Sequence, residues 1–139
     1  MSDSRPRKIA RFVLALVYMA AGLAHLLNPA PFLAITPAWV PQPELVILAT
    51  GVAELLGAAG LLTRRFRHAA GIGLALYALC VYPANLNHAL NGIAVGGETL
   101  GWGYHAPRLL FQPLFIWWAL WAGGVIEWPF GRKERAVAK

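Results

Sequence analysis

The chain has 139 residues, of which 58% are hydrophobic and only 13% charged, and its formal net charge is +6 at pH 7. This length fits one domain, but the composition is too apolar for an ordinary soluble domain. Apart from Arg108, the basic residues are grouped at the beginning, the middle and the end of the chain instead of forming one patch. This pattern argues against a nucleic-acid partner and predicts an integral membrane protein.

Four stretches almost free of charge are each close to the ~20 residues with which a helix crosses a ~30 Å hydrocarbon core. They cover approximately residues 9–27, 45–62, 69–90 and 109–126. The first stretch has a basic start that also fits a signal peptide, but it exceeds the ~7–15 apolar residues of such a segment and is kept as a span. We predict an all-α, four-helix membrane bundle over residues 9–127, between a basic N-terminus (1–8) and a basic tail (128–139).

The basic residues also predict the orientation of these spans. Lys and Arg precede the first span, separate the second from the third and follow the fourth, whereas the other two connections carry none before Arg108. By the positive-inside rule, both termini and the second connection lie in the cytoplasm, and the first and third connections face outward.

The first outward connection contains Pro29, Pro31, Pro37, Pro41 and Pro43. Because prolines this dense oppose helix formation, we expect a stiff, extended lid over the outer mouth of the bundle.

Polar side chains inside the spans are few, and their cost in lipid makes them the best candidates for a functional site. At a rise of 1.5 Å per residue, Glu54 lies roughly 15 Å below the outer end of its span, while the others lie near the outer ends of theirs. The candidate ligand-binding or polar-cavity residues are His25, Glu54, Asn85, His88, Arg108 and Gln112.

Spacing suggests how these side chains face. Asn85 and His88 are three residues apart, and Arg108 and Gln112 are four apart, so each pair shares a helix face. Glu54 has no charged partner one turn away in its own helix, so we predict a pair with Arg108, direct or through water, in an outward-facing cavity. The same residues would also fit a hydrogen-bonded network that fixes helix register without binding a ligand.

A metal or haem site is a less favoured alternative. His25, His88 and His105 could offer imidazole ligands. However, the sequence has no HxxxH motif and no Cys or Met cluster, and the single Cys80 provides no dithiol pair. We therefore assign no metal site.

Several segments together resemble the DoxX family of small four-helix membrane proteins. They are GLAHLLNP (22–29), ITPAWVP (35–41), TGVAELLGAAGLL (50–62), YPANLNHA (82–89) and RLLFQP (108–113). The likeness covers roughly residues 9–126, and its most specific pieces are Gly-Val-Ala-Glu and Pro-Ala-Asn. The resemblance implies a multi-pass protein of a prokaryotic inner membrane, surrounded by the lipid bilayer.

Because DoxX proteins resemble membrane components of redox systems, the resemblance implies a redox-associated accessory or quinone-interacting subunit with a redox protein as partner. A quinone headgroup would accept hydrogen bonds from His25 and Arg108, and Glu54 would accept or relay a proton. The pattern also includes Asn85 and Gln112, but it often has Met where His88 stands, so a role for His88 is particular to this chain. The alternative is a non-redox binder, transporter or isomerase-like protein for a small lipophilic ligand. The sequence leaves open whether the protein is an enzyme and whether it forms a homo-oligomer.

Overall fold

The computed structural model describes residues 4–128, and there the protein is all-α, which confirms this part of the predicted fold class. Residues 1–3 and nearly all of the predicted tail (128–139) lie outside the described residues. The helices are α1 (Arg5–Leu27), α2 (Ala30–Ile35), α3 (Pro43–Leu62), α4 (Arg67–Asn91) and α5 (Trp102–Ala122).

Three helices, α1, α3 and α4, are long and apolar enough to cross a membrane, which indicates a multi-pass membrane protein. The predicted fourth span, α5, has 21 residues but is not among these three. It begins at Trp102 instead of residue 109, and so includes Pro107 and Arg108, which lower its hydropathy. The early start has a packing reason, because the buried His105 ring lies edge-on against His88 of α4, with 4.6 Å between the ring centroids.

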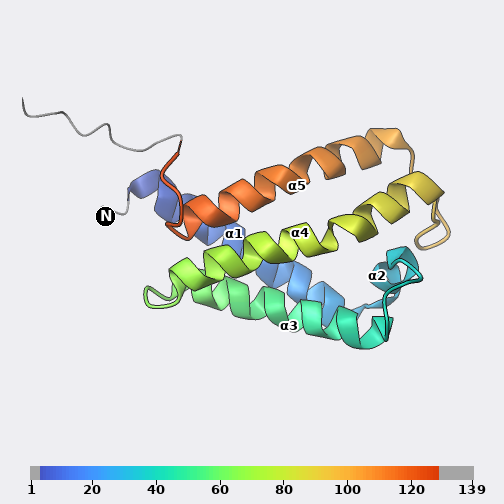
Figure 1. Cartoon of the computed structure of the whole chain (residues 1–139), viewed down its shortest axis with the longest axis horizontal. Coiled ribbons are helices and arrows are strands. Elements are labelled where there is room, and N and C mark those ends of the chain that lie inside the picture. The colour runs from blue at the N-terminus through green and yellow to red at the C-terminus, as the bar shows by residue number, and fades with distance from the viewer. Residues whose placement is uncertain (1–3, 129–139) are drawn as a thin grey trace, which may run out of the picture.

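The four long helices form a bundle in which α1 packs against α3 and α4 packs against α5 (Figure 1). The start of α1, the α3–α4 connection and the end of α5 meet at one end of the bundle, which we call the basic end. The helix α2 and the α4–α5 connection (residues 92–101) lie at the opposite end, which we call the lid end. The basic end is named after Arg5, Arg7, Lys8, Arg11, Arg64, Arg65 and Arg67.

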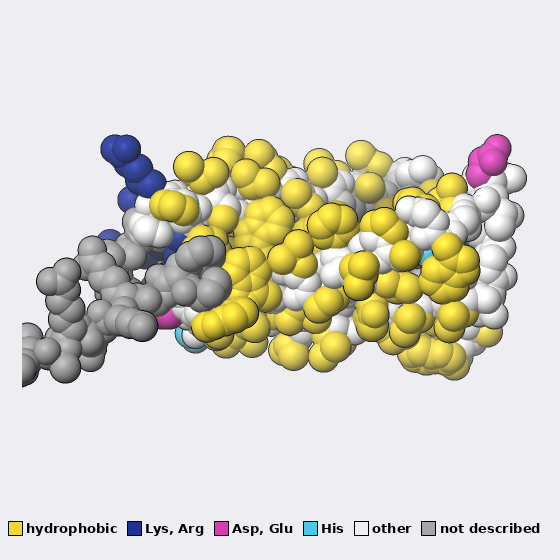
Figure 2. All heavy atoms as spheres, turned by 90° about the horizontal axis from the view of Figure 1, so that it is seen from above, with side chains coloured by type: hydrophobic (Ala, Val, Ile, Leu, Met, Phe, Trp, Pro, Cys, Tyr) yellow, Lys and Arg dark blue, Asp and Glu magenta, His cyan; other side chains and the backbone are white. Residues whose placement is uncertain are grey.

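The surface between the two ends is largely apolar. Figure 2 shows hydrophobic side chains along the length of the molecule, with Lys and Arg at the basic end and an acidic side chain at the tip of the lid end. Trp39 and Trp128, each 73% exposed, stand near the two ends. An apolar belt between aromatic side chains is typical of a protein surrounded by lipid.

The expectation of an extended lid was wrong for residues 30–35, which form α2. Pro29 is the N-cap residue of this helix and Pro31 lies in its first turn, where a missing N–H costs no helical hydrogen bond. Beyond α2 the chain turns through Gln42, which adopts a left-handed conformation (φ 46°), into α3. The lid is thus a short helix followed by a turn.

The apolar core lies towards the basic end, where side chains such as Leu14, Leu61 and Leu74 are buried. The α4–α5 contact there depends on Gly71, because a Cβ atom at this position would come within 2.8 Å of both the Ala119 carbonyl oxygen and the Gly123 Cα atom. Small residues allow helices in lipid to approach this closely.

Two of the arginines expected only to mark topology are buried and bind helix ends. The Arg11 Nε donates a hydrogen bond of 2.8 Å to the carbonyl of Ala122, the last residue of α5. The Arg7 guanidinium donates to the Glu127 carboxylate at 2.9 and 3.0 Å and lies over the Trp121 ring. Cations at the carboxyl end of a helix stabilise its unpaired carbonyls, so these arginines fasten α5 to α1.

Candidate functional site

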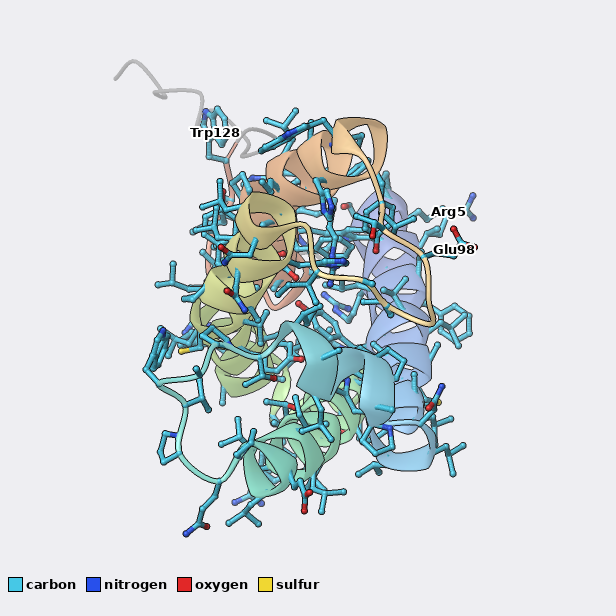
Figure 3. The ribbon with its side chains drawn as sticks, turned by 90° about the vertical axis from the view of Figure 1, so that its right-hand side faces the viewer. Arg5, Glu98 and Trp128 are labelled. Carbon is cyan, nitrogen blue, oxygen red and sulfur yellow. The ribbon has the colours of Figure 1, made fainter. Side chains whose placement is uncertain are left out.

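A cavity of about 720 Å³ lies between the α1/α3 pair and the α4/α5 pair, on the lid side of the apolar core. Its volume is typical of small-molecule sites. Figure 3 views the bundle from the lid end, where α2 and the connection that carries Glu98 face the viewer. The cavity lining includes His25, Glu54, Asn85, Arg108 and Gln112 but not His88.

Among the charged and polar residues on the cavity wall, Glu54 is the least exposed, at 3%. Its Oε2 lies 2.8 Å from the Nδ1 of His25 in α1. The same Nδ1 lies 3.0 Å from the carbonyl oxygen of Ala21, one turn earlier in α1, and donates to it. Nδ1 thus shares its proton with the backbone, and Oε2 has no well-aligned hydrogen-bond donor among the described residues.

Two tyrosines that the sequence analysis missed lie beside this pair. Tyr77 of α4 forms a hydrogen bond with the Glu54 carboxylate, and Tyr18 of α1 packs edge-on against Tyr77. Both line the cavity. Their spacing was a usable signal, since Tyr18 is seven residues before His25 and Tyr77 is eight before Asn85, which are two-turn separations on one helix face.

Asn85 and Gln112 form the wall between α4 and α5. The Asn85 Nδ2 donates a hydrogen bond of 3.1 Å to the Gln112 Oε1, and the Gln112 Nε2 donates to the carbonyl of Ala78. Pro83 lies inside α4 and cannot donate to the Leu79 carbonyl, which is adjacent to that of Ala78. Gln112 therefore supplies a donor next to the place where proline interrupts the helix.

Arg108 lies at the α5 side of the cavity and binds neutral groups. Its Nη1 donates to the Nδ1 of His88 at 3.1 Å and lies 3.3 Å from the Tyr104 hydroxyl. Because Nδ1 accepts this bond, His88 is neutral there and acts behind Arg108, outside the cavity. The direct Glu54–Arg108 pair expected from the sequence is not formed, since among the described residues Glu54 lies against His25 instead.

The histidines do not gather around a common point. His88 and His105 are neighbours near the lid end, while His25 stacks on Phe32 of α2, with 3.7 Å between ring centroids. Within residues 4–128, no group of three His, Cys, Asp or Glu side chains is arranged to hold a metal ion.

The lid helix α2 covers part of the cavity at the lid end of the bundle. Besides the Phe32–His25 stack, the Asn87 side chain of α4 donates a hydrogen bond of 2.9 Å to the carbonyl of Ile35, the last residue of α2. Trp39, in the turn after α2, also lines the cavity. The lid is therefore tied to both α1 and α4.

Comparison with known proteins adds one finding. A protein-family model, described as Domain of unknown function (DUF8561), matches residues 14–123. No curated protein and no solved structure matches the chain. The match spans most of the chain and includes every residue that lines the cavity, whereas the resemblance to DoxX proteins rests on short segments alone. The chain belongs to the family described as Domain of unknown function (DUF8561).

Proposed function

We propose that the protein binds a small lipophilic ligand in the cavity, with the polar headgroup of the ligand against His25 and Glu54. The observation that carries this proposal is the buried His25–Glu54 pair on the wall of a mainly apolar cavity. An ionisable pair in a membrane-embedded bundle costs free energy, and such groups usually mark a ligand or proton site. Asn85 and Gln112 bind each other and can fix helix register, whereas the buried Glu54 Oε2 has no hydrogen-bond partner among the described residues.

In the redox form of this proposal, the ligand is a quinone and the protein is an accessory to a redox partner. The DoxX-like segments favour this form, and so do the aromatic rings of Phe32 and Trp39, which suit a flat headgroup. In this form the chain binds and orients the headgroup and provides proton-carrying groups at Glu54 and Tyr77, while the electrons come from the partner. The alternative form is a non-redox binder or transporter that uses the same cavity.

We also propose that α5 crosses the membrane with α1, α3 and α4, and that both termini face the cytoplasm. The 21 residues of α5 span about 31 Å at 1.5 Å per residue, and the helix packs against α4. The arginines of the basic end support this orientation by the positive-inside rule. Single cysteines introduced at Lys8 and at Glu98, in a Cys80→Ala background, should react with a membrane-impermeant maleimide from opposite sides of sealed vesicles. Labelling of both from the same side would overturn the topology.

Ligand binding can be tested on the protein purified in mild detergent. Native mass spectrometry and solvent extraction should reveal a co-purifying lipophile, and added decylubiquinone should quench the fluorescence of Trp39. Ala84→Phe should lower occupancy by filling the cavity, whereas Ala69→Phe, at an exposed site on the same helix, should not. An extracted quinone supports the redox form and another lipid supports the alternative. No bound lipophile, together with equal behaviour of the two variants, would overturn ligand binding.

A further inference from the structure

In the His25–Glu54 pair, the Glu54 Oε2 lacks a well-aligned hydrogen-bond donor among the described residues. This indicates which chemical group the ligand presents to Glu54. We infer that the headgroup bound at Glu54 donates a hydrogen bond: it is a neutral hydroxyl on an apolar body, such as a phenol, a quinol or a lipophilic alcohol, in preference to a carbonyl. This inference rests on the proposed binding function and narrows the class of ligand.

The first step concerns the donors around Glu54. The carboxylate is 3% exposed, so water does not reach it freely, and it receives a hydrogen bond from Tyr77. The His25 Nδ1 lies 2.8 Å from Oε2, but it shares its proton with the Ala21 carbonyl at 3.0 Å. Oε2 is left buried without an aligned donor among the described residues. A buried acceptor of this kind binds a donor more tightly than a group of equal shape without one.

The second step concerns which donors fit. A carbonyl oxygen would face the Glu54 carboxylate lone pair to lone pair, which is repulsive. An ammonium group would donate, but the cavity wall already carries the Arg108 guanidinium, and the imidazole of His25 stands beside Glu54. A neutral hydroxyl can donate to the carboxylate and carries no charge that Arg108 or His25 would repel. The apolar remainder of the wall then takes up the body of the ligand.

The test uses matched probes in one sample. Native mass spectrometry of the full chain in detergent, with equal concentrations of 4-nonylphenol and its methyl ether, reports the two bound fractions together. We expect the phenol to be preferred by about tenfold, the size of effect produced by one unmet buried hydrogen bond. Nonylbenzene, which lacks the oxygen and the extra bulk of the ether, should also lose to the phenol. Under anaerobic conditions, decylubiquinol should be preferred over decylubiquinone.

The variants assign the preference to Glu54. In Glu54→Gln the amide both donates and accepts, so the preference for the phenol should fall to about threefold or less. Glu44→Gln removes an exposed carboxylate from the same helix, outside the cavity, and should keep the wild-type preference. Equal binding of phenol and ether by the wild-type protein overturns this inference while leaving the proposed binding function intact. Failure of all probes to bind counts against the binding function itself. The wild-type comparison decides the inference even where a variant does not fold.

Discussion

The basic end and the lid end of the bundle use polar residues in opposite ways. At the basic end, the two buried arginines bind groups of their own chain: Arg11 bonds the last carbonyl of α5, and the Arg7 Nη atoms bind Glu127, although the Arg7 Nε has no hydrogen-bond partner among the described residues. At the lid end, among the described residues, Arg108 binds the neutral groups of His88 and Tyr104, and the Glu54 Oε2 has no hydrogen-bond partner. The packing of the two ends also differs, with a closed apolar core towards the basic end and a cavity towards the lid end.

This difference indicates that the basic end mainly stabilises the fold and that the lid end mainly binds the ligand. A polar group that binds another helix of its own chain serves the fold, whereas one that is buried on a cavity wall with an unpartnered atom can bind a ligand. Changes at the basic end should therefore reduce stability, and changes at the lid end should mainly alter coupling between side chains and ligand occupancy. Four predictions test this contrast, from the largest expected effect to the smallest.

The largest effect is expected from Gly71→Ala at the basic end. The new methyl group would meet the backbone of α5 at 2.8 Å, and the helices would have to separate. We expect a loss of about 2–3 kcal/mol in the free energy of unfolding, measured by denaturant titration in detergent. Gly73→Ala on the same helix is the control, because no atom lies within 4 Å of its Cβ position and alanine favours the helix. Equal stability of the two variants would contradict the close contact.

The second prediction separates the observed pair from the one expected from the sequence. A double-mutant cycle with His25→Leu and Glu54→Gln should give a coupling of about 1–3 kcal/mol, because these side chains are in contact. The cycle with Glu54→Gln and Arg108→Leu should be additive within about 0.5 kcal/mol. The free energies of unfolding in detergent supply both cycles. A larger coupling between Glu54 and Arg108 than between His25 and Glu54 would support the pair expected from the sequence.

The third prediction concerns the Asn85–Gln112 hydrogen bond. Replacing each residue by leucine should give a coupling of about 0.6 kcal/mol and at most about 1.7 kcal/mol, as for other side-chain bonds between membrane helices. Gln112→Leu should destabilise more than Asn85→Leu, since Gln112 also donates to Ala78. Thermal unfolding checks both statements. If either variant abolishes ligand binding without loss of stability, the pair belongs to the binding site and not only to helix register.

The smallest effect is expected at the exposed Glu127. Its hydrogen bond with Arg7 lowers the pKa of the Glu127 carboxyl below its ordinary value of 4.5. A lowered pKa means that the pair stabilises the fold above this value and that the stabilisation is lost as the pH falls through the lower, folded-state value. The melting temperature of Glu127→Gln should therefore lie slightly below that of the wild type at neutral pH and converge with it in acid. A difference that persists at low pH would show that the charge pair is not its cause.

The sequence determined the fold class well, and it determined the candidate site in part. Long apolar stretches can satisfy their backbone groups in lipid only as helices, so α1, α3 and α4 were readable from composition. The cost of polar groups in lipid singled out His25, Glu54, Asn85, Arg108 and Gln112, which all line the cavity. Tyr18 and Tyr77 were overlooked because tyrosine carries no charge to mark it and can pack as an ordinary aromatic residue.

Only the tertiary structure decided which partners these residues have. The helix periodicity shows which face a side chain occupies, but not how far a neighbouring helix is rotated or shifted along its axis. That rotation places Glu54 against His25 and Arg108 against His88. It also separates Gly71, which lies against α5, from Gly73, where a Cβ atom would have open space. Which residues come into contact depends on the packing of whole helices. For this reason the sequence identified the residues of the site but not which of them pair.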